Sequence, residues 1–197
     1  MNRYGLIRVF ILDDHEFIRL GVRERLASEA RIEVVGEAAT AELAVAMVPR
    51  LGVDVALLDV RLPRGSGVAA CRDIRSACPQ TACLMLTGHT NEKAMLASVM
   101  AGSAGYVTKL GVGEELAEAV HAVAAGQTLL SKEGIWQVRE QLNSLAAAST
   151  SELSTQDQQV LMLIEEGLTN SEIAAQLSLP EQSVRDSVSS LLATIDV

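Results

Sequence analysis

A nearly continuous apolar run that ends in a carboxylate constrains the fold of this chain more than any other stretch. Residues 53–63 read VDVALLDVRLP, with Gly52 before the run and Pro63 at its end. Such a run, bounded by turn residues, is typical of a strand that is buried on both faces of a parallel sheet. The carboxylate of Asp59 ends that strand, and an ionised group there is costly to bury without a partner or a metal ion. We therefore expect other parts of the chain to supply compensating charge.

Four more apolar runs alternate with segments of helical period over the first 125 residues. This order predicts an α/β fold, a doubly wound parallel sheet of five strands with helices on both faces. The composition, 49% apolar and 21% charged, is that of a globular chain. We expect the strands at Arg8–Leu12, Ile32–Ala38, Val53–Leu58, Ala82–Thr87 and Gly105–Thr108.

The chemically distinctive residues fall at the ends of four predicted strands. Asp13 and Asp14 follow the first strand, Asp59 the third, and Thr87 and Lys109 end the fourth and fifth. Because the carboxyl ends of parallel strands share one edge, these side chains should meet at a ligand-binding edge. Carboxylates so close together repel one another, which favours a hard divalent cation such as Mg²⁺. A small anion such as a phosphoryl group could be held beside it, with Asp59 as its acceptor.

The remainder of the chain is predicted to be helical. Residues 126–153 form a connector in which Ile135, Val138, Leu142 and Leu145 recur at helical spacing, followed by a small, polar hinge at 146–151. Residues 154–197 read as a small all-α domain of three helices. The first begins near Ser154, the second at a capping box over residues 169–172, and the third at Pro180.

Four receiver motifs resemble the response regulators of two-component signalling: residues 12–16 (LDDHE), 58–63 (LDVRLP), 86–87 (LT) and 105–109 (GYVTK). With its C-terminal helices, the chain is similar to the NarL/FixJ subfamily, in which a receiver precedes a LuxR-type helix-turn-helix. The resemblance covers nearly the whole chain. It implies a CheY-like receiver over residues 1–125, a linker over 126–153, and a helix-turn-helix over 154–197 that ends before the fourth helix common in that subfamily.

The resemblance also implies a chemistry for the predicted edge. Asp59 would be the phosphoacceptor, loaded by a sensor histidine kinase. Asp14, Asp59 and the backbone carbonyl of Arg61 would hold Mg²⁺, with help from Asp13.

In the same family, the residues that follow the fourth and fifth strands carry the switch. Thr87 and Lys109 would bind the phosphoryl oxygens, and Tyr106 is the aromatic side chain expected to rotate as the neighbouring loops repack. The partners implied are a sensor histidine kinase and a second regulator, in a homodimer or in a heterodimer with a related protein.

The charge of the C-terminal segment departs from the family pattern. Residues 151–197 contain one Arg against eight Asp and Glu, a net charge of −7, whereas residues 1–150 carry only −2. The third helix of that segment would offer Gln182, Arg185 and Ser189 to the major groove. Proteins that bind DNA usefully neutralise about six to ten phosphates with cations. Two hypotheses therefore stay open: a transcription factor that binds DNA, and a regulator whose acidic helix-turn-helix binds protein and modulates a relative.

An enzyme is the less favoured alternative. Haloacid-dehalogenase-type phosphatases also form an aspartyl phosphate on a doubly wound sheet, but their nucleophile lies in a D-x-D pattern after the first strand. Here an adjacent pair, Asp13 and Asp14, stands at that position. The three cysteines show no C-x-x-C spacing, which favours buried thiols over a zinc site or disulfides. No apolar stretch approaches the length of a membrane span or a signal peptide, so we expect a cytoplasmic protein.

Overall fold

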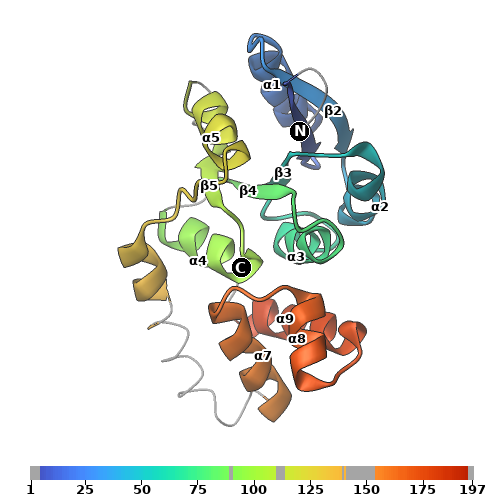
Figure 1. The fold of residues 1–197 in the computed structure, drawn as a ribbon, viewed down its shortest axis with the longest axis vertical. Helices are drawn as coiled ribbons and strands as arrows, with labels where there is room; N and C mark the ends of the chain where they lie inside the picture. Colours follow the sequence, from blue (N-terminus) through green and yellow to red (C-terminus); the bar gives the residue numbers. More distant parts are fainter. Residues whose placement is uncertain (1–4, 89–90, 110–113, 139, 141–153, 195–197) are drawn as a thin grey trace.

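The protein consists of an α/β part followed by a group of three helices that packs beneath it (Figure 1). We describe it from a computed structural model, which covers residues 5–88, 91–109, 114–138, 140 and 154–194.

The α/β part is built on one sheet of five parallel strands in the order β2-β1-β3-β4-β5. The predicted doubly wound sheet is thus confirmed, with two differences in strand bounds. β1 begins one residue earlier than expected, and β3 covers Val55–Asp59, so that Asp59 is part of the strand rather than the residue after it. The strands are β1 Ile7–Leu12, β2 Ile32–Ala38, β3 Val55–Asp59, β4 Ala82–Thr87 and β5 Gly105–Thr108.

Helices cover both faces of the sheet. Side chains alternate between these faces along each strand, so both faces carry apolar side chains that the helices bury. In β1, Val9 and Ile11 pack against one group of helices, and Phe10 and Leu12 against the other. The first face is covered by α1 Glu16–Ala27 and α5 Glu114–Ala124. The second is covered by α2 Ala41–Leu51, α3 Gly67–Ala77 and α4 Asn91–Ala101.

The C-terminal group contains α7 Thr155–Glu165, α8 Asn170–Leu177 and α9 Glu181–Thr194. Its predicted starts are confirmed. Ser154 and Thr169 both form capping boxes, with the side chains at the third helical positions, Asp157 and Glu172, binding back to the cap N–H groups. These boxes satisfy N–H groups that have no partner inside the helix.

The connector is described only in part. Residues 132–138 are helical, as predicted, and Val138 is buried while Trp136 is exposed. Leu142, Leu145 and the predicted hinge lie outside the described residues. All three cysteines are free and buried, in agreement with the sequence prediction. Among the residues that the structure covers, we find no helix with the length and apolarity needed to cross a bilayer.

The C-terminal helices do not stand apart from the α/β part. Buried side chains of α7, α8 and α9 join those of α2, α3 and α4 in one continuous apolar cluster. α3 and α4 are therefore the elements through which the sheet and the C-terminal helices touch, as Figure 1 shows.

The start of α3 lies unusually close to the end of β3. The N–H of Gly67 donates to the carbonyl of Val60 at 3.1 Å, and a Cβ added at Gly67 would collide with the carbonyl oxygen of Asp59. This position therefore admits only glycine without a shift of the strand end that carries Asp59.

We predict that Gly67→Ala lowers the free energy of unfolding by roughly 1–3 kcal/mol, the usual range for forced overpacking. Gly21→Ala is the matched control, because Gly21 is an exposed position inside α1 with no atom in the way of a Cβ. It should stabilise the protein by about 0.5–1 kcal/mol, since alanine is the better helix former. Urea unfolding followed by circular dichroism measures both, and equal effects of the two variants would contradict the close packing.

Candidate functional site

The predicted strand-end residues converge on one small cavity at the carboxyl edge of the sheet. Its volume is about 170 Å³, and Asp59, Thr87 and Lys109 line it, each from a different strand or the residue just after one. His15, Val60, Arg61 and Gly88 complete the lining. The parallel sheet thus brings together residues that are far apart in sequence, such as Asp59 and Lys109, which are 50 positions apart.

Lys109 holds the centre of this site through two ion pairs. Its Nζ lies 2.7 Å from Oδ2 of Asp59 and 2.8 Å from Oδ2 of Asp13. Both carboxylates are almost fully buried. Burial by itself would lower the pKa of Lys109, but the hydrogen bonds and attraction from the two carboxylates outweigh it and raise the pKa. The ammonium therefore stays charged and fixed at the point where an anion would bind.

The position of Asp59 is electrostatically unfavourable for its ionised form. Desolvation raises the pKa of Asp59 to about 6; the neighbouring charge of Asp13 adds to the rise, and the hydrogen bond from Lys109 opposes it. The backbone N–H of Arg61 donates to Oδ1 of Asp59 at 3.3 Å. Two carboxylates that are buried side by side leave an excess of negative charge at the site. The binding of a cation there should therefore be favourable.

The donor atoms present fit a divalent cation. Asp13, Asp14, His15 and Asp59 each offer one ligand atom, and these atoms all lie within 4.8 Å of one another. Three of the four are the carboxylates that the sequence predicted. His15 was not predicted as a site residue, although its place directly after the two aspartates was a usable signal.

Thr87 and Tyr106 connect the cavity to the helices on one face of the sheet. Thr87 is buried at the end of β4, and Tyr106 is a half-buried residue of β5 that packs against the apolar cluster shared by α3, α4 and the C-terminal helices. Met85 and Tyr106 are paired across these two strands. Tyr106 therefore contacts the same apolar cluster that the C-terminal helices join.

The predicted DNA-contacting residues lie at a second place, against α3. Gln182, Arg185 and Ser189 face away from the core of the C-terminal group, as expected, and they border a cavity of about 210 Å³ whose opposite wall includes Asp73 of α3. Arg185 binds Oδ1 of Asp73 through Nε at 2.7 Å and Oε1 of Glu181 through Nη2 at 2.7 Å. The hydrogen bond to Asp73 raises the pKa of Arg185.

A buried arginine fixes the same contact from the other side. Arg72 of α3 is 1% exposed and donates three hydrogen bonds, to Oδ1 of Asn170 at 2.8 Å and to the carbonyls of Leu168 at 2.8 Å and Met100 at 2.9 Å. Burial, and repulsion from Arg75, lower the pKa of Arg72 to about 10, so it stays protonated at neutral pH. Arg72 therefore ties the last turn of α4 to the start of α8.

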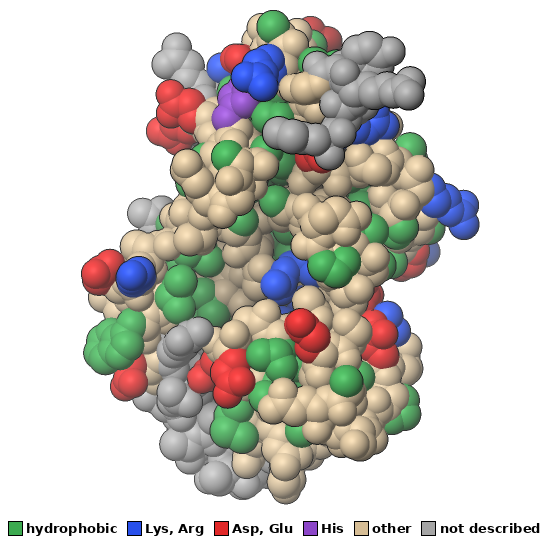
Figure 2. All heavy atoms as spheres, viewed as in Figure 1, with side chains coloured by type: hydrophobic (Ala, Val, Ile, Leu, Met, Phe, Trp, Pro, Cys, Tyr) green, Lys and Arg blue, Asp and Glu red, His purple; other side chains and the backbone are tan. Residues whose placement is uncertain are grey.

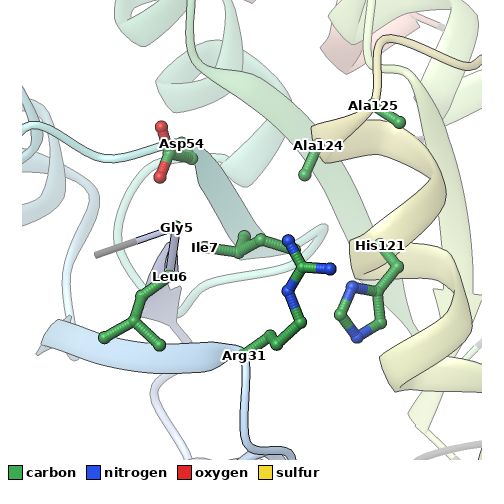
Figure 3. A pocket seen from close by; sticks show the side chains of 8 residues that line it. All are labelled: Gly5, Leu6, Ile7, Arg31, Asp54, His121, Ala124 and Ala125. Atoms are coloured by element: carbon green, nitrogen blue, oxygen red, sulfur yellow. The ribbon is translucent and has the colours of Figure 1, made fainter. Parts of the chain in front are cut away.

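A larger cavity, of about 310 Å³, lies at the opposite edge of the sheet (Figure 3). There the side chains of Arg31 and His121 point toward each other, and Asp54 lies on the other side of the opening. None of the predicted site residues lines it. We assign the functional site to the smaller cavity because four strand ends place their charged and hydroxyl groups in or beside it.

Both parts of the chain match known families. Residues 9–121 match the response regulator receiver domain, and residues 151–197 match the bacterial regulatory proteins of the luxR family. The DNA-binding transcriptional activator DevR/DosR of Mycobacterium tuberculosis (strain ATCC 25618 / H37Rv) is 42% identical over 192 residues, covering 96% of this chain and 88% of that protein.

More distant relatives support the same assignment. The response regulator protein VraR of Staphylococcus aureus (strain Mu3 / ATCC 700698) is 30% identical over 191 residues, covering 97% of this chain and 91% of that protein. The crystal structure of a LuxR-family two-component response regulator from Aurantimonas sp. SI85-9A1 superposes with a TM-score of 0.61 and 31% identity, over 69% of this chain and 97% of that chain.

The raised pKa of Asp59 makes a prediction about stability. A carboxyl group whose pKa is higher in the folded state stabilises the fold fully below its unfolded pKa of about 4, and this stability is lost as the pH rises through about 6. The side chain of Asn in Asp59→Asn cannot ionise. At pH 7.5, with EDTA present to remove metal ions, we expect the free energy of unfolding of this variant to be roughly 2 kcal/mol higher than that of the wild type. The gain should vanish near pH 4.

The measurement is urea unfolding of both proteins across this pH range. Glu118→Gln serves as the control, because Glu118 is an exposed carboxylate on α5 and its removal should bring no such pH-dependent gain. A less stable Asp59→Asn protein at pH 7.5 would show that the ion pair with Lys109 outweighs the cost of burial.

Proposed function

Because this chain belongs to the response regulators that join a receiver domain to a luxR-family regulatory domain, and controls transcription as such, we propose that phosphorylation of Asp59 by a sensor histidine kinase is its input. The observation that carries the proposal is the buried Asp59 carboxylate beside Lys109 and the acidic pair. We propose a receiver over residues 1–125, a linker over 126–153 and a helix-turn-helix over 154–197.

The proposed reaction is a phosphoryl transfer between two side chains. An oxygen of Asp59 attacks the phosphorus of the kinase's phosphohistidine, the P–N bond breaks as the P–O bond forms, and the imidazole nitrogen keeps the electron pair and takes up a proton. Mg²⁺, when bound by Asp14, Asp59 and the carbonyl of Arg61 with help from Asp13, supplies charge neutralisation. Lys109 is placed to bind a phosphoryl oxygen, because it already contacts Oδ2 of Asp59.

The phosphoryl group changes the balance of charge at the site. It adds a negative charge of about 1.5 to 2 and three acceptor oxygens in a space that already holds buried carboxylates. Lys109 and the hydroxyl of Thr87 are the groups that can move to meet it. We propose that this movement passes through Tyr106 and α4, both of which pack against the cluster that includes the C-terminal helices.

The C-terminal helices are held by the receiver in this conformation. Arg72 binds Asn170, and Asp73 binds both Asn170 and Arg185. The face of α9 that would meet DNA is therefore turned towards α3. We propose that phosphorylation weakens these contacts and frees α9, which makes the described conformation the inactive one.

A second candidate output is favoured by one observation. Arg185 is the only Lys or Arg of residues 151–197, and both of its ion pairs are with carboxylates of this chain. Figure 2 shows acidic side chains in the lower part of the molecule, on the side that faces the α/β part. Such a surface suits a protein partner, and we propose a related regulator with a basic recognition helix as the alternative target, reached through a heterodimer.

The phosphorylation step is tested by labelling. We expect acetyl phosphate with Mg²⁺ to add one phosphoryl group to the wild type, as seen by intact-protein mass spectrometry. Asp59→Asn should take up none. Asp54→Asn is the control, since Asp54 stands just before the same strand and outside the cavity, and it should be labelled like the wild type. Full labelling of Asp59→Asn would contradict the assignment.

The output is tested by fluorescence anisotropy of a labelled duplex at several salt concentrations, with and without beryllofluoride. Each phosphate contact contributes a slope of about −0.9 to a plot of log affinity against log salt. A homodimer with one Arg185 per subunit should therefore show a slope near −2. A mixture of this chain with a basic relative should show a steeper salt slope, and this slope should change with the amount of this chain in the mixture. A steep slope from this chain alone would contradict the protein-binding alternative.

The closed conformation is tested with Asp73→Asn, which removes the receiver's ion pair with Arg185. We expect this variant to expose α9 without phosphorylation. Its binding to the duplex, or to the related regulator, should then give an anisotropy change close to that of the beryllofluoride-treated wild type. Glu118→Gln, on the opposite face of the sheet, should behave like the untreated wild type. An unchanged response in Asp73→Asn would show that this contact does not restrain α9.

A further inference from the structure

Arg75 of α3 carries a guanidinium nitrogen that is buried without an acceptor. Among the described residues, its Nη1 has no hydrogen-bond partner. Its Nη2 donates to the carbonyl of Gly167 at 3.4 Å, so Arg75 belongs to the contact between the α/β part and the C-terminal helices. A buried donor that lacks an acceptor is costly, and more so when it is charged. An acceptor that reached Nη1 would therefore bind favourably.

The glycine that follows α4 gives Nη1 its place. A Cβ added at Gly102 would collide with Nη1 of Arg75 and would also press on its Cζ. Gly102 has a φ of 64°, the left-handed conformation that is common just after a helix. The guanidinium of Arg75 thus lies directly over the backbone that ends α4, in space that any other residue at this position would fill.

Arg75 and Gly102 also line a cavity of about 420 Å³ at the amino edge of the sheet, beside the starts of β4 and β5. Among the described residues that line it, Arg75 is the only base and Asp54 the only acid. Oδ2 of Asp54 already accepts the backbone N–H of Arg8 at 2.9 Å. Gln80, an exposed residue, lines the same cavity and has an amide group that can donate to a ligand.

The charge of Arg75 is close to that of a second arginine. Arg72 lies three positions earlier on α3, and the hydrogen bonds of both side chains end on neutral oxygens, from Asn170 and from backbone carbonyls. Repulsion from Arg75 contributes, after burial, to the lowered pKa of Arg72. An anion beside Arg75 would reduce this repulsion.

We propose that this cavity binds a small oxyanion through Nη1 of Arg75, with the amide of Gln80 as a second donor. A hydrogen bond from a guanidinium to a charged oxygen is among the strong ones in proteins. Inorganic phosphate and a small carboxylate are two sources of such oxygens. Because Arg75 holds Gly167 through its other nitrogen, the bound anion would add to the contact between the two parts of the chain. The inference does not depend on phosphorylation of Asp59.

A purely structural role for Arg75 is the alternative. The guanidinium would then contribute only its packing on Gly102 and its hydrogen bond to Gly167, and no anion would bind. The two roles separate in Gln80→Glu, which adds a carboxylate to the lining of the cavity and leaves Arg75 in place. A binding role predicts that this variant has a weaker affinity for anions, because like charges repel.

The experiment is urea unfolding of the full chain at increasing phosphate concentration, in EDTA and at constant ionic strength. A ligand that binds the folded state raises the unfolding midpoint, and the concentration dependence gives its affinity. We expect the phosphate affinity to fall about tenfold or more in Arg75→Gln, the usual effect of losing a charged hydrogen bond. It should also fall in Gln80→Glu.

Arg50→Gln is the matched control. Arg50 is an exposed arginine in the last turn of α2, as Arg75 is in the last turn of α3. This variant should respond to phosphate like the wild type, and its response also measures the general stabilisation that phosphate gives to folded proteins. Equal responses of the wild type, Arg75→Gln and Gln80→Glu would overturn the proposal.

NMR of the chain labelled with ¹⁵N in its arginines locates the site. The Nε–H signal that is missing from Arg75→Gln should shift saturably in the wild type when phosphate or acetate is added. The anion that saturates this shift at the lower concentration identifies the source of the oxygens. No saturable shift with either anion would overturn the proposal.

Labelling by acetyl phosphate with Mg²⁺ separates this inference from the proposed function. Wild type that is labelled but shows no saturable shift of the Arg75 signal would overturn the anion site alone. Wild type that shows the shift but takes up no phosphoryl group would overturn the proposed function alone.

Discussion

The ion pairs of Lys109 with Asp13 and Asp59 are the interaction on which the site depends. Two nearly buried carboxylates at adjacent strand ends repel each other, and neither has enough solvent to screen the repulsion. Lys109 contacts both at 2.7–2.8 Å and so permits them to share one edge of the sheet. Even so, desolvation keeps the pKa of Asp59 raised to about 6, with the charge of Asp13 adding to the rise and Lys109 opposing it. A bound cation would favour the ionised form of Asp59 against this cost of burial.

The same logic of buried charge extends to the contact between the two domains. Arg72 is withdrawn from water in the interior of the chain, and it is tolerated there because three carbonyl or amide oxygens accept its hydrogen bonds. One of these belongs to α4 and two belong to the segment that starts α8. Separation of the domains would leave the guanidinium without two acceptors unless water replaced them. The contact is therefore costly to open, because the buried guanidinium would lose two of its three acceptors.

The strands and the strand-end residues could be predicted because both follow from local rules. Largely apolar runs of four to seven residues define the strands, and parallel strands put their carboxyl ends on one edge. Helix starts at Ser154 and Thr169 were equally predictable, since a capping box is complete within four residues. Only the bounds of β1 and β3 differed, and there by one or two residues.

The contacts between distant segments could not be predicted in this way. Asp73 and Arg185 are 112 positions apart, and Arg72 and Asn170 are 98 apart. No periodicity or motif links such pairs, because their pairing depends on how the C-terminal helices dock on α3. His15 was missed for a different reason: its neighbours in sequence already explained the acidic cluster, and the direction of its ring depends on the backbone of the β1–α1 turn.

The position of Arg185 affects both proposed outputs, DNA binding and the binding of a related regulator. In the proposed DNA-binding role, its guanidinium could not bind Asp73 and a phosphate at the same time, and Arg185 is the one Lys or Arg of α9. Opening the domains would release only that one charge per subunit, while Glu181 and Asp186 on the same helix would still repel a phosphate backbone. A homodimer would thus gain little electrostatic free energy from DNA. A partner that brings its own basic helix would overcome this deficit, and the acidic α9 would then attract that partner for the same reason that it repels DNA.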